Sequence, residues 1–247
     1  MAEIVKKYRR IWRMGAVVLA GALLTGAGSA WWHAAHWEPS AKSYPVQGAW
    51  LDQRHDARTV LTLAEGGADG APLVRFLYAT ASIGASGRNE RFAEEHERAG
   101  RSGLPVGAVH VFDPCVPADR QSANFVTLVP RDGDLLPPAV QLDATGEDCP
   151  RPVRAAEVES ELVTFLNQIE AHAGRRAILA PTAAFEEAYG FGARSQRPLW
   201  LAQDRAEPAY AGGNWTIWTA NSALSLPQLD MSIGWLVMRS DPAEEAG

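Results

Sequence analysis

LPPAVQLD, at residues 136–143, contains a strand-like pattern that recurs along the chain. It leads into a short apolar run, 139–143, that ends on the carboxylate of Asp143. Apolar runs of this length suit strands that are buried on both faces, as in a parallel sheet. Similar runs occur along the chain at 74–80, 105–112, 176–182, 198–204, 216–222 and 230–237.

Helical patterns alternate with these strands. The clearest is an apolar stripe at helical spacing, followed by Gly174 as a stop signal. Its members are Val158, Leu162, Phe165, Leu166 and Ile169. Further helices are predicted at 89–99, 119–128 and 183–189. The first of these is highly charged and offers only Phe92, Ala93 and Ala99 to a core.

The alternation of strand and helix predicts an α/β fold with a parallel sheet, either closed as a barrel or left open. A short connection rich in Ser, Leu and Pro separates 216–222 from 230–237, which is too little chain for a helix. A regular eightfold barrel is therefore not expected. In a barrel, chemistry belongs at the carboxyl ends of the strands, and four polar residues fall there: Asp113, Asp143, Asp204 and Asn221.

Length and charge limit the class of protein. The 247 residues, 47% hydrophobic and 21% charged, suit one large domain plus a leader. Five basic residues against Glu3 give residues 1–13 a charge of +4, which leaves −10 for the rest of a total of −6. An acidic body of this kind argues against nucleic acid as a partner.

Residues 14–32 contain no ionisable side chain over 19 positions, about the length of a helix that crosses a bilayer. Two interpretations compete: an uncleaved anchor in the inner membrane, or a signal peptide cut after the small residues at 28–30. We favour the anchor, because the apolar run exceeds the ~7–15 residues of a signal-peptide core. An anchor would place three aromatic side chains at the membrane interface, Trp31, Trp32 and Trp37.

These features divide the chain into a basic cytoplasmic flank at 1–13, the anchor or signal segment at 14–32, a linker at 33–44, a folded domain at 45–240 and a disordered tail at 241–247. Either leader exports the folded domain. We expect a cell-envelope protein that is held at the inner membrane with this domain in the periplasm, or secreted if the leader is cleaved.

Export places the two cysteines, Cys115 and Cys149, in an oxidising compartment, and we predict a disulfide between them. The alternative is a pair of free buried thiols. The chain has no Cys-x-x-Cys motif and no Cys/His cluster, so we predict no zinc site and no other metal or cofactor.

Several motifs resemble the family 25 glycoside hydrolases, lysozymes that cleave peptidoglycan. LPPAVQLD is similar to a family segment in which LPP and apolar residues precede an Asp-x-Glu catalytic pair. The other similar segments, in the same order as in the family, are YPVQG (44–48), RFLYAT (75–80), GLPVGAVHVF (103–112), QSANF (121–125), FLNQIEAHAGRRAIL (165–179), PLWLA (198–202) and WTIW (215–218). The resemblance covers roughly residues 44–237 and implies an irregular TIM-like β/α barrel with eight strands and fewer than eight helices.

The resemblance also implies catalytic positions, and several of them have changed. The family's acid Glu falls on Asp143 and its partner Asp on Gln141, which cannot ionise. The family's first-strand Asp falls on Trp50, and its acidic residue near the last strand on Asp230. Asp52 shares a strand face with Trp50 and is a candidate replacement for the lost carboxylate. The predicted catalytic set is therefore Asp143 as general acid, with Asp230 or Asp52 as the second charge. The alternative for Asp143 is a strand-end carboxylate that caps a helix or pairs with an Arg, and the alternative for Asp230 is an Asp that caps a loop.

Six residues are candidates to bind the sugar. Four are aromatic side chains that would stack on pyranose rings, and each has the alternative role of core packing: Trp50, Tyr78, Trp200 and Trp218. Gln141 is a candidate hydrogen-bonding residue, with a paired polar core position as its alternative. His110 lies inside an apolar strand, where a hydrogen-bonded core histidine is the alternative to a contact with substrate.

Two functions follow from the resemblance. The first is acid-catalysed hydrolysis of the glycan strands of peptidoglycan, weakened by the altered pair. The second is a family member that has lost catalysis and serves as a peptidoglycan-binding or scaffold module. The implied partners are glycan strands and, through the N-terminal segment, the inner membrane.

Overall fold

The computed structural model describes residues 2–131 and 134–239, apart from the side chains of residues 2–11 and 13–18. The tail expected at 241–247 lies outside the described residues. The chain divides into two compact units, Met1–Trp37 and Glu38–Gly247, which are described separately.

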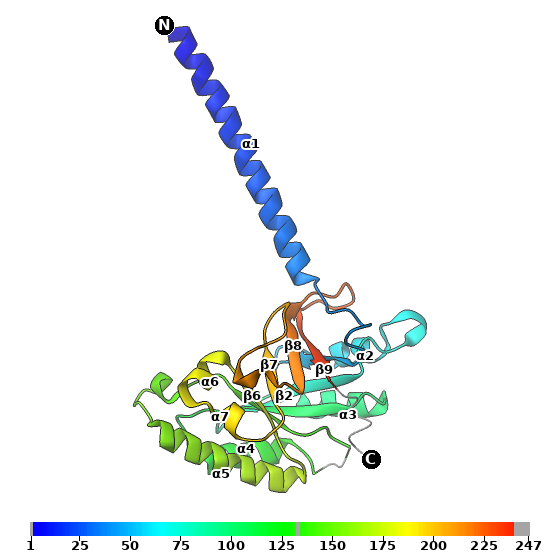
Figure 1. Cartoon of the computed structure of the whole chain (residues 1–247). Coiled ribbons are helices and arrows are strands. Elements are labelled where there is room, and N and C mark those ends of the chain that lie inside the picture. Colours follow the sequence, from blue (N-terminus) through cyan, green and yellow to red (C-terminus); the bar gives the residue numbers. More distant parts are fainter. Residues whose placement is uncertain (1, 132–133, 240–247) are drawn as a thin grey trace. The chain divides into compact units, whose positions relative to one another are not determined.

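The first unit is a single helix, α1 (Ala2–Ala35) (Figure 1). It includes the predicted anchor or signal segment at 14–32, of which the side chains at 14–18 lie outside the described residues. Large apolar side chains are exposed along its second half: Leu19, Leu23, Leu24, Trp31 and Trp32. In the part of the chain that is described, no helix has both the length and the hydropathy needed to cross a bilayer.

The second unit contains an eight-stranded, nearly closed barrel. Its strands are β1 (Gln47–Leu51), β2 (Phe76–Ile83), β4 (Val106–Val111), β5 (Ala139–Leu142), β6 (Ile178–Pro181), β7 (Trp200–Ala202), β8 (Ile217–Leu224) and β9 (Ile233–Met238). They follow the order β6-β5-β4-β2-β1-β9-β8-β7, and a parallel bridge between Leu179 and Leu199 joins β6 to β7 at the seam. The two-residue strand β3 (Gly87–Arg88) pairs with β2 outside this path.

The barrel strands are parallel except for β9, which pairs antiparallel with both β1 and β8. Residues 225–232, which connect β8 to β9, contain no helix. A parallel return needs a crossover of about a dozen residues or more, so this connection brings the chain back antiparallel. The expectation of an irregular barrel with a missing helix is therefore confirmed.

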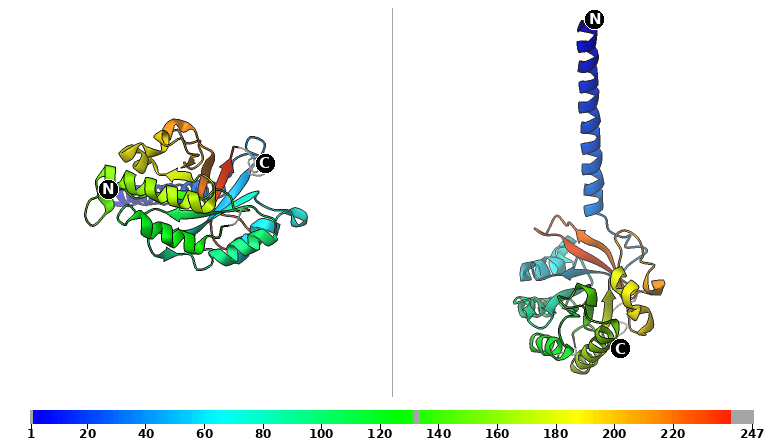
Figure 2. Two further views of the ribbon diagram at one scale, coloured as in Figure 1. Left: turned by 90° about the horizontal axis from the view of Figure 1, so that it is seen from below. Right: turned by 90° about the vertical axis from the view of Figure 1, so that its left-hand side faces the viewer.

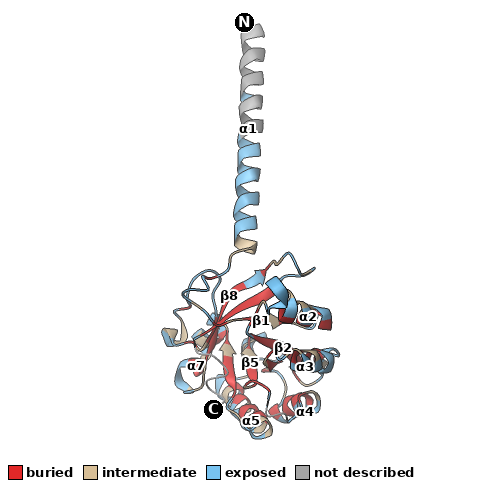
Figure 3. Cartoon of the chain, turned by 90° about the vertical axis from the view of Figure 1, so that its right-hand side faces the viewer, coloured by how far each residue is buried: buried red, intermediate tan, exposed pale blue. Residues whose placement is uncertain are grey.

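Within residues 38–131 and 134–239, six helices accompany the barrel strands: α2 (Ala57–Glu65), α3 (Phe92–Arg101), α4 (Ala118–Leu128), α5 (Ala155–Ala173), α6 (Ala183–Tyr189) and α7 (Phe191–Arg194). Short 3-10 helices occur at η1 (Ala68–Gly70), η2 (Gly146–Asp148) and η3 (Ala211–Gly213). The longer helices lie against the outside of the sheet (Figure 2), and burial is concentrated in the strands and in the helix faces that cover them (Figure 3).

The helix predictions hold with one informative exception. In α5 the predicted stripe is fully buried, and Gly174 ends the helix in a left-handed conformation, φ 67°. In α3 the buried residues are Phe92, Glu95 and Ala99, whereas Ala93 is exposed. The buried face of α3 therefore includes the carboxyl group of Glu95, which was not predicted from the sequence.

Aromatic side chains fill the barrel interior, and two glycines make room for them. The interior cluster contains Phe76, Tyr78 and Trp200. A Cβ atom at Gly107 would lie 2.2 Å from Tyr78 Cε1, and one at Gly48 would lie 2.4 Å from Phe76 Cζ. Neither position can carry a side chain while these rings stay in place. The glycines on β1 and β4 therefore leave room for Phe76 and Tyr78 inside the barrel.

The predicted disulfide between Cys115 and Cys149 is confirmed. Cys115 lies in the loop that follows β4, and Cys149 lies in the loop that follows β5. Since β4 and β5 are parallel neighbours, the bond ties together two loops at the carboxyl ends of the strands.

Candidate active site

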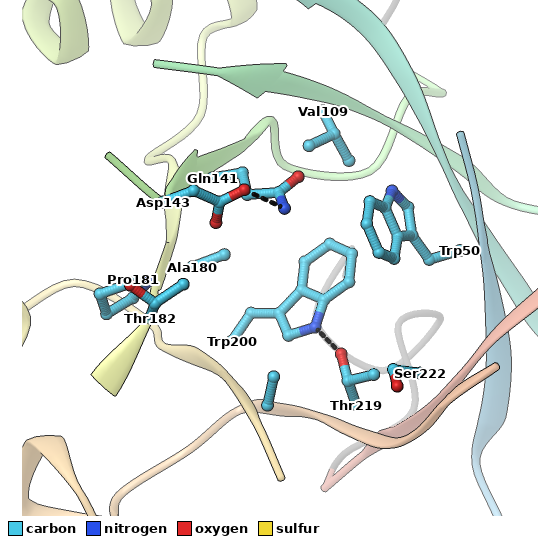
Figure 4. A pocket seen from close by; sticks show the side chains of 11 residues that line it. Trp50, Val109, Gln141, Asp143, Ala180, Pro181, Thr182, Trp200, Thr219 and Ser222 are labelled. Carbon is cyan, nitrogen blue, oxygen red and sulfur yellow. Dashed lines mark hydrogen bonds between the residues drawn. The ribbon is translucent and has the colours of Figure 1, made fainter. Parts of the chain in front are cut away.

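A cavity of about 130 Å³ opens at the carboxyl ends of the barrel strands. Its apolar walls come from Trp50 on β1, Val109 on β4, Ala180 on β6, and Trp200 and Ala202 on β7. Its polar groups are Gln141 on β5 and Asp143 just after it, Thr182 just after β6, and Thr219 and Ser222 within β8 (Figure 4). This is the end of a β/α barrel where catalytic groups are found.

Asp143 and Gln141 stand together in this cavity. Gln141 Nε2 donates a 2.8 Å hydrogen bond to Asp143 Oδ2 (Figure 4). The Asp143 side chain reaches solvent at the mouth, but the surrounding walls remove part of its hydration. This burial raises the pKa of Asp143 above its ordinary value, against the opposing effect of the hydrogen bond from Gln141. The raised pKa of Asp143 thus comes from burial and not from the charge of a second carboxylate.

Two tryptophans form the aromatic floor of the cavity. The rings of Trp50 and Trp200 meet edge to face, with centroids 6.1 Å apart. Hydrogen bonds fix both indoles, since Trp200 Nε1 donates to Thr219 Oγ1 at 2.7 Å and Trp50 Nε1 donates to Thr80 Oγ1 at 3.2 Å. Because both indole rings are held in place, they form a preorganised surface for a flat, mostly apolar face of a ligand.

Thr182, Thr219 and Ser222 also line the cavity and were not among the predicted residues. Ser222 Oγ donates to Asp204 Oδ2 at 3.0 Å, and its backbone N–H donates to Asp204 Oδ1 at 2.8 Å. Thr219 could have been predicted from the sequence, because residues i and i+2 of a strand share a face. Thr219 therefore lies on the inward face of β8 with the core residue Ile217.

Three of the predicted sugar-binding residues do not line the cavity. Tyr78 lies fully buried beneath it, where its hydroxyl donates to Pro137 O and its ring contacts Trp200 at 5.2 Å. Trp218 alternates to the outer face of β8 and packs against Tyr44 and Trp215. Both are placed as core residues rather than as surfaces for stacking a sugar.

His110 is also away from the cavity. It is fully buried, 2.7 Å from Ser82 Oγ and 3.2 Å from Gln121 Oε1, with its ring 4.4 Å from that of Phe165 on α5. Burial lowers the pKa of His110 to about 4, partly offset by the Gln121 hydrogen bond, so the ring is neutral. This is a hydrogen-bonded core histidine between the sheet and its helices.

The other two predicted carboxylates, Asp52 and Asp230, have different surroundings from those of Asp143. Asp52 is engaged by Arg54, whose Nε donates to Asp52 Oδ2 at 2.8 Å. Burial alone would raise the pKa of Asp52, but the Arg54 hydrogen bonds and the His55 and Arg54 charges bring it below its ordinary value. Asp230 lines a second pocket, formed with Arg58 and other residues. Neither residue lines the cavity that holds Asp143.

Comparison with known families identifies the barrel. The model for glycosyl hydrolases family 25 matches residues 67–229, well over half of the chain. This chain belongs to glycosyl hydrolase family 25. The match begins after β1 and ends before β9.

Solved structures of family 25 proteins share the fold. A family 25 glycosyl hydrolase from Bacillus anthracis is 21% identical with a TM-score of 0.70, and the alignment covers 85% of this chain and 95% of that one. A lysozyme from Streptomyces coelicolor is 18% identical with a TM-score of 0.69, covering 81% and 95%. A family 25 lysozyme from Aspergillus fumigatus is 18% identical with a TM-score of 0.63, covering 81% and 97%. No curated protein sequence matches the chain.

Proposed function

We propose that this family 25 domain binds the glycan strand of peptidoglycan at its barrel mouth and has lost paired-carboxylate hydrolysis. One observation carries the proposal: among the described residues that line the cavity, Asp143 is the sole carboxylate. The position that the family fills with a second carboxylate holds Gln141, which hydrogen-bonds to Asp143.

Glycoside hydrolysis by this route needs two carboxyl groups. They lie about 5–5.5 Å apart in retaining enzymes and about 6.5–9.5 Å apart in inverting ones, with one acting as acid and the other as nucleophile or base. Gln141 can donate and accept hydrogen bonds but cannot carry the negative charge that stabilises an oxocarbenium-like transition state. Asp52 is ion-paired with Arg54, and Asp230 lines another pocket, so neither is a ready replacement.

The cavity retains what a sugar needs for binding. Trp50 and Trp200 offer apolar faces, and Gln141, Thr219 and Ser222 offer hydrogen-bonding groups around them. At about 130 Å³ the cavity is smaller than the roughly 300–1,000 Å³ of sites that enclose a whole ligand. A site of this size suits one unit of a long glycan strand better than a free small molecule.

Cosedimentation of the full-length protein with purified sacculi tests binding, and muropeptide release from the same sample tests cleavage. We expect the protein to pellet with sacculi and to release no muropeptides. Trp50→Ala should weaken pelleting, whereas Val163→Ala on the exposed face of α5 serves as the unaffected control. Muropeptide release that Asp143→Asn abolishes would overturn the loss of catalysis, and failure of the wild type to pellet would overturn binding.

A second candidate is slow hydrolysis with Asp143 as the general acid and the acetamido group of the sugar in place of the missing carboxylate, a route that some glycosidases use. The raised pKa of Asp143 favours it, since the carboxyl stays protonated to higher pH than an ordinary aspartate. Such activity would fall as the pH rises through that raised pKa. Muropeptide release measured from pH 4 to pH 8 distinguishes this route from pure binding.

We further propose that the N-terminal segment holds the domain in the cell envelope. The continuous helix α1 and the exposed apolar side chains of Leu19, Leu23 and Leu24 support this role. Membrane fractionation with an alkaline wash, followed by N-terminal sequencing, tests it. A full-length protein that resists extraction indicates an anchor, whereas a mature chain that begins after residues 28–30 indicates a cleaved signal peptide.

A further inference from the structure

A second pocket, of about 230 Å³, lies at the same end of the barrel as the cavity. It is formed by the loop from β1 to α2, by α2 itself, by Arg91 just before α3 and by the connection from β8 to β9. The same strands, β1 and β8, supply Trp50 and Ser222 to the cavity. His55 joins the two loops, because its Nε2 donates to Ser232 O at 3.0 Å. The pocket is thus a built feature of the barrel rim, at the same end as the proposed glycan site.

The lining of this pocket is charged with both signs. Three guanidinium groups, from Arg54, Arg58 and Arg91, face two carboxylates, from Asp56 and Asp230. A charged group that already pairs with another part of the fold is less available to a ligand. The existing partners of these five groups therefore indicate which of them a ligand can contact.

Three of these five groups are already engaged. Arg54 pairs with Asp52. Arg91 Nη1 donates to the backbone oxygens of Gln53 at 3.2 Å and His55 at 3.4 Å. Asp56 caps α2 by accepting from the backbone N–H groups of Arg58 at 3.0 Å and Thr59 at 3.1 Å. The helix N-terminus is therefore satisfied internally and is not the binding element.

Arg58 and Asp230 remain. Within the described residues, neither the Arg58 guanidinium nor the Asp230 carboxylate forms a hydrogen bond or an ion pair, although the Arg58 charge acts on Asp56 at longer range. They line the same pocket from different elements, α2 and the β8–β9 connection, without pairing with each other. A cation and an anion placed in this way across a pocket complement a ligand that carries both charges.

We propose that this pocket binds a zwitterionic peptide end, with its carboxylate at Arg58 and its ammonium group at Asp230. Stem peptides attached to the glycan strand of peptidoglycan carry free carboxylates and a free side-chain amine. The inference rests on the proposed glycan binding, because a strand seated in the cavity would bring its peptide to the adjoining rim. The site would make the domain prefer glycan that bears peptides over glycan stripped of them.

Binding of the full-length protein to two ligands tests this proposal: intact sacculi, and glycan strands from which an amidase has removed the peptides. We expect the wild type to bind the peptide-bearing material more tightly. Arg58→Gln and Asp230→Asn should each weaken that binding about fivefold to tenfold and leave binding to stripped strands unchanged. Arg120→Gln, an exposed arginine on α4, is the matched control and should change neither.

Titration with the isolated stem peptide and with inorganic phosphate separates the possible failures. Peptide binding that Arg58→Gln weakens supports the pocket even if the protein binds no glycan, in which case the proposed function alone fails. Equal affinity of the wild type for sacculi and stripped strands overturns the inference. Phosphate binding that requires Arg58 but not Asp230, with no binding of peptide, also overturns it and assigns the pocket to a simple anion.

Discussion

At the scale of single residues, the environment of each carboxyl group decides its role more than its identity does. Asp143 is crowded by apolar walls and contacted by an amide, Asp52 is paired with a guanidinium, and Asp230 lines another pocket without an ion pair in the described part of the chain. Glu95 on α3 is fully buried, and one of its oxygens has no hydrogen-bond partner among the described residues. These four acidic side chains therefore differ in their burial and in their hydrogen-bond and ion-pair partners.

Restoring the family's carboxylate pair tests the site directly. In the variant Gln141→Asp combined with Asp143→Glu, two ionisable groups stand where the family has them, and we expect muropeptide release above that of the wild type. The reason is that Gln141→Asp supplies a negative charge that the native amide cannot carry. Gln141→Asn with Asp143→Glu is the control, because it changes the same positions without adding the second charge. Equal release by the two double variants would show that the pair is not the missing element.

The buried Glu95 predicts a pH-dependent stability. Burial raises the pKa of Glu95 to about 7, against the opposing effects of the Asn89 hydrogen bond and the Arg91 charge. The unfolded chain releases this proton at the ordinary pKa, so the folded state binds more protons between pH 4.5 and pH 7 and loses stability as the pH rises through that window. We expect a loss of about 2–3 kcal/mol from this group between pH 4.5 and pH 8.

Thermal unfolding across that pH range measures the effect. Glu95→Gln keeps an oxygen for the Asn89 hydrogen bond but cannot ionise, so its Tm should fall less than that of the wild type between pH 5 and pH 8. Because a buried amide has its own desolvation cost, the slope and not the absolute Tm is the readout. Parallel curves for the two proteins would contradict a raised pKa at this position.

At the scale of elements, periodicity explains why the helices and strands form where they do. The stripe of α5 is buried to the last residue, and the glycine after it ends the helix as the sequence indicates. Along β8, the alternation that turns Ile217 and Thr219 inward turns Trp218 outward. The spacing of residues along a helix or strand therefore determines which of them share a face. The neighbouring elements determine which face is buried.

The α5 stripe gives a stability prediction with an internal control. Leu162 is fully buried, whereas its neighbour Val163 is 41% exposed. Leu162→Ala removes core volume between the helix and the sheet and should lower the free energy of unfolding by about 2–5 kcal/mol. Val163→Ala should change it by less than about 0.5 kcal/mol. Chemical denaturation of both variants checks this, and similar losses would show that the face is assigned wrongly.

At the scale of the whole molecule, the site depends on loops that several strands bring to one end of the barrel. The disulfide between Cys115 and Cys149 joins two of those loops, and its cysteines are 34 residues apart in the sequence. Asp143 is the first residue of the loop that follows β5, which is one of the two. The bond therefore bears on both the stability of the barrel and the shape of its mouth.

Removal of the disulfide tests both effects. The double variant Cys115→Ser, Cys149→Ser should lower the free energy of unfolding by about 3–4 kcal/mol, because a loop of this length is no longer closed in the unfolded chain. Pelleting with sacculi should also weaken as the rim loops loosen. The wild type treated with a reductant is the matched comparison. An unchanged Tm in both samples would mean that the bond contributes little to stability.

From residue 74 onward, the alternation of strands and helices could be predicted from the sequence, as could the missing last helix, the disulfide and the family, because these follow from periodicity, spacing and motifs along the chain. The helix α2 was not predicted. The sequence singled out Asp143, Gln141, Trp50 and Trp200, which line the cavity in the structure, and their roles there stay predictions. The structure was needed to show that neither Asp52 nor Asp230 lines the cavity with Asp143 and that Glu95 is buried. Those outcomes depend on closing the sheet into a barrel, which sets distances between residues far apart in the chain, and no local pattern encodes such distances.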